Sequence, residues 1–203
     1  MMMDTLTATL APYALAPLGT LPDQGRSIVL IGPDEPAFWP LFTQSPEYKD
    51  GAPNPMDRWS RRVFTHLAAT LDAEPLFPFG GPTYAPFYSW AISTGRFWTS
   101  PISFLVHDKT GLFASFRGAL RMPGKYPQEK SAKPCDTCAQ PCATACPVDA
   151  FASGYDVAAC KTHVSSDKGR DCRTGGCLAR RACPIGQANR LPAQSAFHME
   201  SFL

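Results

Sequence analysis

The sequence predicts an α+β fold followed by a smaller module at the C-terminal end. Residues 27–32 (SIVLIG) form a short apolar run that is rich in β-branched residues, which is typical of a buried strand. Residues 55–73 place apolar side chains at helical spacing behind Pro55, which predicts an amphipathic helix. All eight cysteines lie between residues 135 and 183. The first part of the chain therefore builds the α+β domain, and the cysteine-rich part is a separate module.

The remaining elements of the first part are short, because glycine and proline interrupt them. An aromatic loop, LFPFGGPTYAPFYSW, leads into a short helix near residues 86–95. Residues 101–107 and 112–120 flank Asp-Lys-Thr-Gly and predict a β-hairpin. The polar, proline-rich stretch 121–134 predicts a linker. We accordingly expect a domain at 1–124, a linker at 125–134, a cysteine-rich domain at 135–190 and a C-terminal tail at 191–203.

Composition and charge exclude several partners. A net charge of +2 with 18% charged residues is too balanced for a nucleic-acid or anionic-membrane partner. No stretch approaches the roughly 18 apolar residues of a membrane span, and the N-terminus lacks the basic start of a signal peptide. The sequence therefore predicts a cytoplasmic protein that binds neither membrane nor nucleic acid.

The cysteines form two groups, each of which ends in Cys-Pro. The first is Cys135-x2-Cys138-x3-Cys142-x3-Cys146-Pro147, and the second is Cys160-x11-Cys172-x4-Cys177-x5-Cys183-Pro184. A secreted disulfide scaffold would spread its cysteines through the domain that it crosslinks. Thiols crowded into one part of a cytoplasmic chain indicate metal binding instead.

Two kinds of metal site compete for these thiols. Structural zinc usually takes two CxxC pairs, and only Cys135 and Cys138 have that spacing. In two-cluster ferredoxins, closely spaced cysteines hold one cubane and the Cys-Pro cysteine of each run ligates the other cluster. Proline then turns the chain away from its own cluster, because its φ is fixed and it lacks an N–H. One cubane beside a zinc ion or a smaller cluster, or zinc alone, are the alternatives.

Residues 131–188 thus resemble bacterial-type ferredoxin domains with two [4Fe–4S] clusters. The resemblance implies crossed ligand sets: Cys135, Cys138, Cys142 and Cys183 for one cluster, and Cys146, Cys160, Cys172 and Cys177 for the other. The chain departs from the usual pattern in one longer gap, between Cys138 and Cys142, and in the stretched spacing of the second run.

Three polar residues accompany the cysteines. His163 follows Cys160 by about one helical turn, and we expect a surface or supporting residue in preference to a ligand. Arg180 and Arg181 precede Cys183. We expect a solvated helix face there in preference to a docking site for an acidic electron donor.

Two stretches of the first part could hold a flat cofactor. Gly80 and Gly81 lie among aromatic residues such as Tyr84, and glycine lets a backbone approach a ligand whose face aromatic rings can cover. His107 ends one predicted strand and Arg117 lies on the next, so both could face one cavity. The alternatives are a tight packed turn, a turn-capping histidine and an exposed arginine in a salt bridge.

The order of the two parts resembles corrinoid-dependent epoxyqueuosine reductases and reductive dehalogenases, and SPISFLVHDKTGLFASFRGAL is similar to a hairpin of the cyanocobalamin decyanase family. That hairpin has the pattern HPxxGxWxxxRG, and the matching positions are His107, Gly111, Phe116, Arg117 and Gly118, with Asp108 in place of proline and Phe113 in place of tryptophan. The resemblance implies a nitroreductase-like domain that binds cobalamin. Electrons from a low-potential donor protein would reach the cobalamin through the clusters, and the reduced cobalamin would lose its upper ligand. About 130 residues is short for such a domain, so we expect a pocket that is either open or completed by the second subunit of a homodimer.

Two other functions stay open. The chain could be an electron-carrier ferredoxin whose first domain docks a partner, or a nitroreductase-like enzyme with flavin in the same pocket. The sequence holds neither a GxGxxG motif after a strand nor a GxxxxGK[ST] loop, so it predicts neither a dinucleotide site nor a P-loop.

Overall fold

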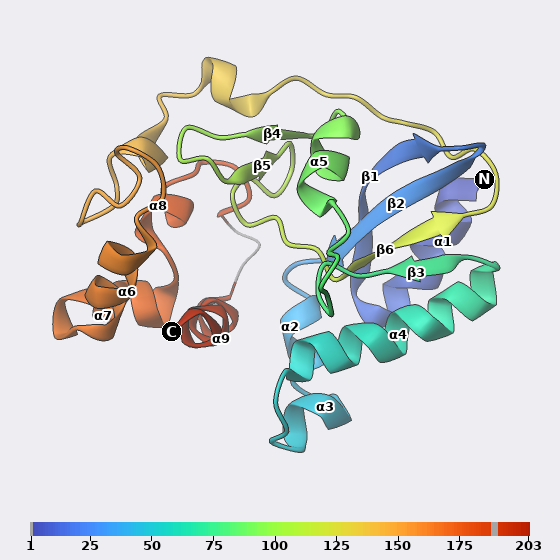
Figure 1. Ribbon diagram of the computed structural model, residues 1–203, viewed down its shortest axis with the longest axis horizontal. Helices are drawn as coiled ribbons and strands as arrows, with labels where there is room; N and C mark the ends of the chain where they lie inside the picture. Colours follow the sequence, from blue (N-terminus) through green and yellow to red (C-terminus); the bar gives the residue numbers. More distant parts are fainter. Residues whose placement is uncertain (1, 188–190) are drawn as a thin grey trace. The chain divides into compact units, whose positions relative to one another are not determined.

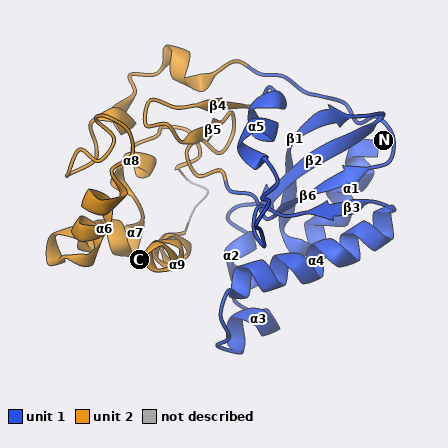
Figure 2. Cartoon of the chain, in the orientation of Figure 1, with its two compact units in different colours: residues 1–96, 115–131 blue, residues 97–114, 132–203 orange. Residues whose placement is uncertain are grey.

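The computed structural model describes residues 2–187 and 191–203, and it confirms the α+β class (Figure 1). The chain forms two compact units (Figure 2). Unit 1 comprises residues 1–96 and 115–131, and unit 2 comprises residues 97–114 and 132–203. The division differs from the expected one, because residues 97–114 belong with the cysteine-rich part.

Unit 1 is built on an antiparallel sheet in the order β1-β2-β6-β3, whose strands are β1 (Leu15–Asp23), β2 (Arg26–Pro33), β6 (Gly118–Met122) and β3 (Glu74–Leu76). Val29 lies opposite both Thr20 and Leu120, which fixes the register of the central strand β2. The predicted strand at 27–32 is confirmed as part of β2, and it is almost wholly buried because it runs through the middle of this sheet.

The principal helix of unit 1 is α4 (Pro55–Leu71), which confirms the helix predicted at 55–73. Its apolar face buries Trp59, Val63 and Phe64. A Cβ at Gly118 would lie 2.6 Å from the ring of Phe64, so the glycine lets α4 approach β6 closely. The other helical elements of the unit are α1 (Met2–Leu10), η1 (Ala11–Tyr13), α2 (Phe38–Phe42), α3 (Pro46–Lys49) and α5 (Phe87–Ser93), and the last confirms the short helix expected near 86–95.

The predicted hairpin of 101–107 with 112–120 is wrong. The first of these segments contains β5 (Leu105–His107), which pairs with β4 (Phe97–Thr99) in unit 2. The second contains β6, which pairs with β2 and β3 in unit 1. The turn itself forms, since His107 and Gly111 exchange two backbone hydrogen bonds of 3.0 Å. After this turn the chain continues to β6, which pairs with β2. Just before β6, the amide of Arg117 donates a hydrogen bond to the carbonyl oxygen of Ile31 in β2.

Unit 2 consists of the β4–β5 hairpin and short helical elements. These are η2 (Pro134–Thr137), η3 (Pro141–Ala143), α6 (Val157–Ser165), η4 (Asp167–Gly169), α7 (Arg170–Gly175), α8 (Leu178–Arg181) and α9 (Pro192–Phe202). The segment expected as a C-terminal tail at 191–203 is thus largely the helix α9, which packs against α7. Among the described residues, no helix has the length and apolar character needed to cross a membrane.

Candidate metal centres

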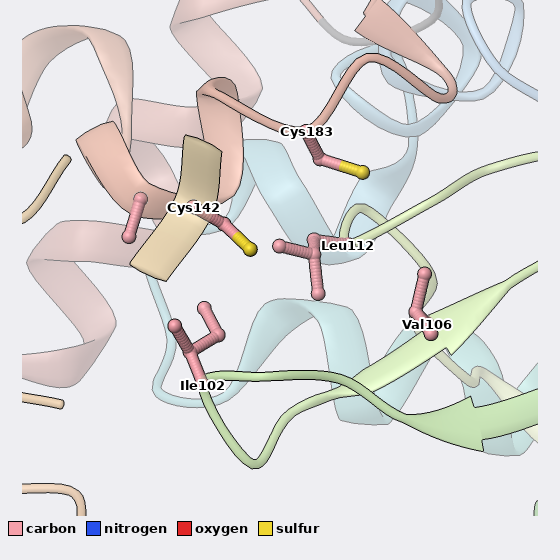
Figure 3. Close-up of a cluster of buried hydrophobic side chains, with 6 residues drawn as sticks. Ile102, Val106, Leu112, Cys142 and Cys183 are labelled. Atoms are coloured by element: carbon pink, nitrogen blue, oxygen red, sulfur yellow. The ribbon is translucent and has the colours of Figure 1, made fainter. Parts of the chain in front are cut away.

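Four of the cysteines line one cavity of unit 2, referred to below as the first cavity. They are Cys135, Cys138, Cys142 and Cys183. The remaining wall is largely apolar and consists of Ser100, Pro101, Val106, Leu112, Gln140, Pro141 and Pro184. Cys142, Cys183, Val106 and Leu112 belong to one cluster of buried side chains (Figure 3). Three of the thiols come from one short run, and Cys183 comes from the end of the second run.

Close backbone contacts bring Cys183 to the first cavity. Gly111 has a φ of +59°, and a Cβ on it would overlap the carbonyl oxygen of Ile185 and lie 3.0 Å from Sγ of Cys183. On the other side of this contact, Gly186 has a φ of +73°, and a Cβ on it would lie 2.5 Å from the carbonyl oxygen of Thr110. Only glycine fits both the left-handed conformation and the short separation. The turn at 107–111 therefore holds the Cys-Pro segment in place.

The other four cysteines line a separate cavity, referred to below as the second cavity. They are Cys146, Cys160, Cys172 and Cys177. The rest of the wall consists of Pro147, Val148, Phe151, His163, Val164, Leu178, Ala179 and Met199. The two cavities thus divide the cysteines into the same two sets that the crossed scheme assigns, with Cys146 apart from its own run.

Two of the thiols that line the second cavity lie on helices and not in a single loop. Cys160 lies on α6, which begins where the side chain of Asp156 accepts a hydrogen bond of 2.9 Å from the amide of Ala159. Cys172 lies on α7, and Arg173 of that helix donates to the carbonyl oxygens of Val164 and Ser166. These bonds fasten α7 to the end of α6. The long spacing of the second run follows, because the chain must form two helices between its ligands.

The thiols lie in surroundings that disfavour a bare negative charge. Burial raises the pKa of Cys135, Cys142, Cys172 and Cys177 above the usual value of a thiol. At Cys172 and Cys177, hydrogen bonds from backbone amides partly offset the effect of burial on the pKa. Two other thiols also have an amide close by: that of Ala150 lies 3.4 Å from Sγ of Cys146, and that of Gln140 lies 3.3 Å from Sγ of Cys138. A bound cation would stabilise the thiolates further. Across the described part of the chain, no three His, Cys, Asp or Glu side chains converge on a site for one metal ion.

The sequence pointed to one wall residue of the second cavity, His163, and gave no sign of another, Met199. His163 lines it, which agrees with a position near the cysteines and leaves its role as ligand or supporting residue a prediction. Met199 comes from α9 and carries no sequence signal, since a single methionine in a predicted tail has no distinctive spacing.

The glycine-rich loop of unit 1 folds on itself. A Cβ at Gly81 would lie 2.8 Å from the ring of Tyr84, so this ring covers the face that a flat ligand would need. Arg61 lies beside Gly80, where a Cβ would be 3.0 Å from its guanidinium, and its charge stands 5.2 Å from the ring centre of Phe77. These contacts favour the alternative of a tight packed turn.

His107, predicted in the same pocket, belongs to unit 2. It is 1% exposed, and its Nδ1 lies 3.3 Å from the amide of Thr110 and 3.4 Å from that of Lys109. Its Nε2 lies 3.0 Å from a carboxylate oxygen of Asp108. Both ring nitrogens thus have partners within the turn, which is what a turn-capping histidine requires.

Phe116 and Arg117, the last two predicted pocket residues, lie in unit 1. The ring of Phe116 is 5.6 Å from that of Phe87. Burial lowers the pKa of Arg117 to about 10, while Asp57 and Glu35 favour its charged form. Its Nε is buried without a hydrogen-bond partner among the described residues. Arg117 is therefore partly buried, and the alternative of an exposed arginine in a salt bridge does not describe it.

No protein-family model, no curated protein and no solved structure matches this chain. The two cavities lined by cysteines are therefore the features of the molecule that bear on its function.

Proposed function

We propose that this protein carries two [4Fe–4S] clusters and transfers electrons one at a time. The observation that supports the proposal is the division of the eight cysteines between two cavities, four to each. In a cubane each of four cysteines binds a different iron, so the ligands stand around the cluster. Four thiols in the wall of one cavity, from segments far apart in the chain, match that requirement.

The residues around the thiols suit such a cluster. The largely apolar walls would limit the contact of a cluster with water, and solvent exposure is one of the factors that set its reduction potential. Amides that point at Cys138 and Cys146 stabilise negative charge on the sulfurs. The bound clusters would supply one-electron transfer, and the chain would supply the ligands, the apolar surroundings and the hydrogen bonds. A reducing cytoplasm would keep the thiols available, so we place the protein there.

A corrinoid or flavin as the electron acceptor stays a prediction from the resemblance. The residues expected to hold it do not fit an open ligand face, because Tyr84 covers Gly81 and the turn engages both nitrogens of His107. A carrier function with an external acceptor needs no such face. Proposed in full, the protein receives electrons from a low-potential donor and passes them to a partner or to a corrinoid.

One experiment tests the function and the acceptor together. The protein is purified without oxygen, reduced with dithionite, freed of excess reductant and mixed with hydroxocobalamin, with FMN, or with a viologen of higher potential as a simple one-electron acceptor. The proposal predicts that the visible absorbance of the clusters bleaches on reduction and returns when the viologen is added. Recovery with hydroxocobalamin at a saturating rate would support the corrinoid as acceptor. A protein without reducible visible absorbance would refute the electron-transfer function.

A further inference from the structure

A third cavity lies within unit 2, and no cysteine is part of its described wall. Its volume of about 350 Å³ is in the range of sites that hold small organic ligands. The helices α7, α8 and α9 all contribute to it (Figure 2). The residues that line it are Phe113, Gly175, Arg181, Gln187, Pro192 and Ser195. The wall thus combines one cation, two further polar side chains and an aromatic ring.

The two arginines of α8 have different surroundings. Nε of Arg180 donates to the carbonyl oxygen of Leu112 at 2.7 Å, and its guanidinium lies 5.9 Å from the ring centre of Phe113. These contacts hold the segment of Phe113 beside α8. Arg181 instead lines the third cavity, and its side chain is 39% exposed. The predicted solvated helix face therefore suits Arg181 and is wrong for Arg180.

The guanidinium of Arg181 can bind an anion and keep its protein partner. Its Nη1 donates to a carboxylate oxygen of Asp171 at 2.8 Å. Within the part of the chain that the structure describes, this is the hydrogen bond that the guanidinium makes, so the edge formed by Nε and Nη2 is available to a ligand. Such an edge binds both oxygens of a carboxylate at once. Gly175 leaves room for this arrangement, because a Cβ on it would lie 2.9 Å from Nη1 of Arg181.

The charges and the shape of the third cavity favour one class of anion. Arg181 supplies a single positive charge, and Asp171 beside it would repel the second negative charge of a phosphate. Phe113 and Pro192 supply apolar surface, which a flat organic body can cover. A small inorganic ion would leave most of the volume unfilled. The wall therefore suits a singly charged organic acid.

We propose that the third cavity binds a small aromatic carboxylate, whose carboxylate group pairs with Arg181 and whose ring lies against Phe113. The binding is noncovalent. This inference goes beyond the proposed function, because it concerns a wall without cysteines and its test measures binding in place of electron transfer.

The test is calorimetric titration of the protein, purified without oxygen, with benzoate as the probe. The native chain should bind benzoate saturably. R181Q should weaken binding by about tenfold or more, because it removes charge-assisted hydrogen bonds. D171N should bind benzoate at least as tightly as the native chain, since it removes a competing carboxylate. R170Q is the matched control: Arg170 is an exposed arginine of α7 outside the described wall, and its loss should leave binding unchanged.

Several results would overturn the proposal. The first two are a native protein without saturable benzoate binding and an R181Q variant with native affinity. Weaker binding by D171N would show that the ion pair, and not the available edge of Arg181, is what matters. Inorganic phosphate that binds more tightly than benzoate, or uncharged benzamide that binds as tightly, would contradict the class of ligand.

A conservative variant covers the case in which R181Q does not fold. R181K keeps the charge without the planar edge, so weakened benzoate binding would support the proposal and native affinity would overturn it. None of these failures touches the proposed function, which depends on iron and sulfide in the first and second cavities.

Discussion

The two units stabilise themselves by different means. Unit 1 has a core of large apolar side chains, among which Trp59, Phe64 and Leu30 are almost fully buried. Unit 2 has few such side chains, and its buried cluster includes Cys142 and Cys183 beside Ile102, Val106 and Leu112. Cys172 is buried as well. In unit 2, therefore, proposed metal ligands occupy the places that apolar side chains fill in unit 1.

This difference has a consequence for folding. A small apolar core supplies limited stability, and small domains often add metals for that reason. When a metal site forms only in the folded state, the free energy of metal binding becomes free energy of folding. Unit 2 should thus depend on its clusters, and unit 1 should not.

Removal of the metal should give the largest effect. In protein stripped of iron by a chelator under reducing conditions, we expect the amides of α6, α7 and α8 to exchange with solvent rapidly, because the thiols lose the group that draws them together. The amides of β2 and α4 should keep their protection. Hydrogen exchange read by mass spectrometry measures both, and intact protection of α6–α8 in the stripped protein would contradict the dependence.

Pairs of cysteine substitutions test the crossed assignment within unit 2. Cys142 and Cys183 line the same cavity, so replacing both with serine should remove one cluster and leave about four irons of about eight. Cys142 and Cys146 line different cavities, although they are neighbours in the sequence. Replacing those two should remove both clusters.

Iron analysis of the two double variants gives the answer directly. If the chain used each run for its own cluster, the results would be reversed: the Cys142/Cys146 variant would keep half of the iron and the Cys142/Cys183 variant would lose nearly all of it.

A smaller effect is expected at Gly111. Gly111→Ala should lower the free energy of unfolding by about 2–4 kcal/mol, because the left-handed φ adds strain and the Cβ would press on Ile185 and Cys183. Gly51→Ala is the matched control: its φ of +69° is similar, and nothing lies within 4 Å of its Cβ. Thermal unfolding with iron counts should show loss of the first cluster for Gly111→Ala only, and equal behaviour of both variants would refute the close approach.

The smallest effect concerns an exposed ion pair of unit 1. Arg58 donates to both carboxylate oxygens of Asp50 at 2.7 Å, and this lowers the pKa of Asp50 from 3.8 to about 2. A lowered pKa contributes stability that is present above pH 3.8 and is lost as the pH falls through about 2. Asp50→Asn should therefore weaken unit 1 slightly at neutral pH and by less at pH 2. Urea unfolding of metal-free protein measures this, and an equal loss at both pH values would contradict it.

The sequence predicted much of unit 1, and the reasons for its failures are specific. The strand β1 was not expected because Pro17 and Pro22 interrupt it, yet an edge strand tolerates proline, and β1 lies at the edge of the sheet. The Asp-Lys-Thr-Gly turn was recognised, but local turn chemistry could not show that the strands on either side join different sheets.

At the candidate site, too, the sequence predicted what local spacing shows and missed what depends on contacts between distant residues. The two Cys-Pro endings gave the sets Cys135–Cys142 with Cys183, and Cys146 with the second run, and their ligand role stays a prediction. The partial burial of Arg180 had no local signal, because its partner Leu112 lies far away in the sequence. Met199 and the glycine contact with Cys183 likewise depend on tertiary packing.

Analysis of the anaerobically purified native protein for iron, acid-labile sulfide and zinc shows whether the chain carries two cubanes. Two cubanes predict about eight irons and about eight sulfides per chain, with negligible zinc. Zinc without sulfide, or a protein that binds no metal when iron and sulfide are supplied, would contradict the account.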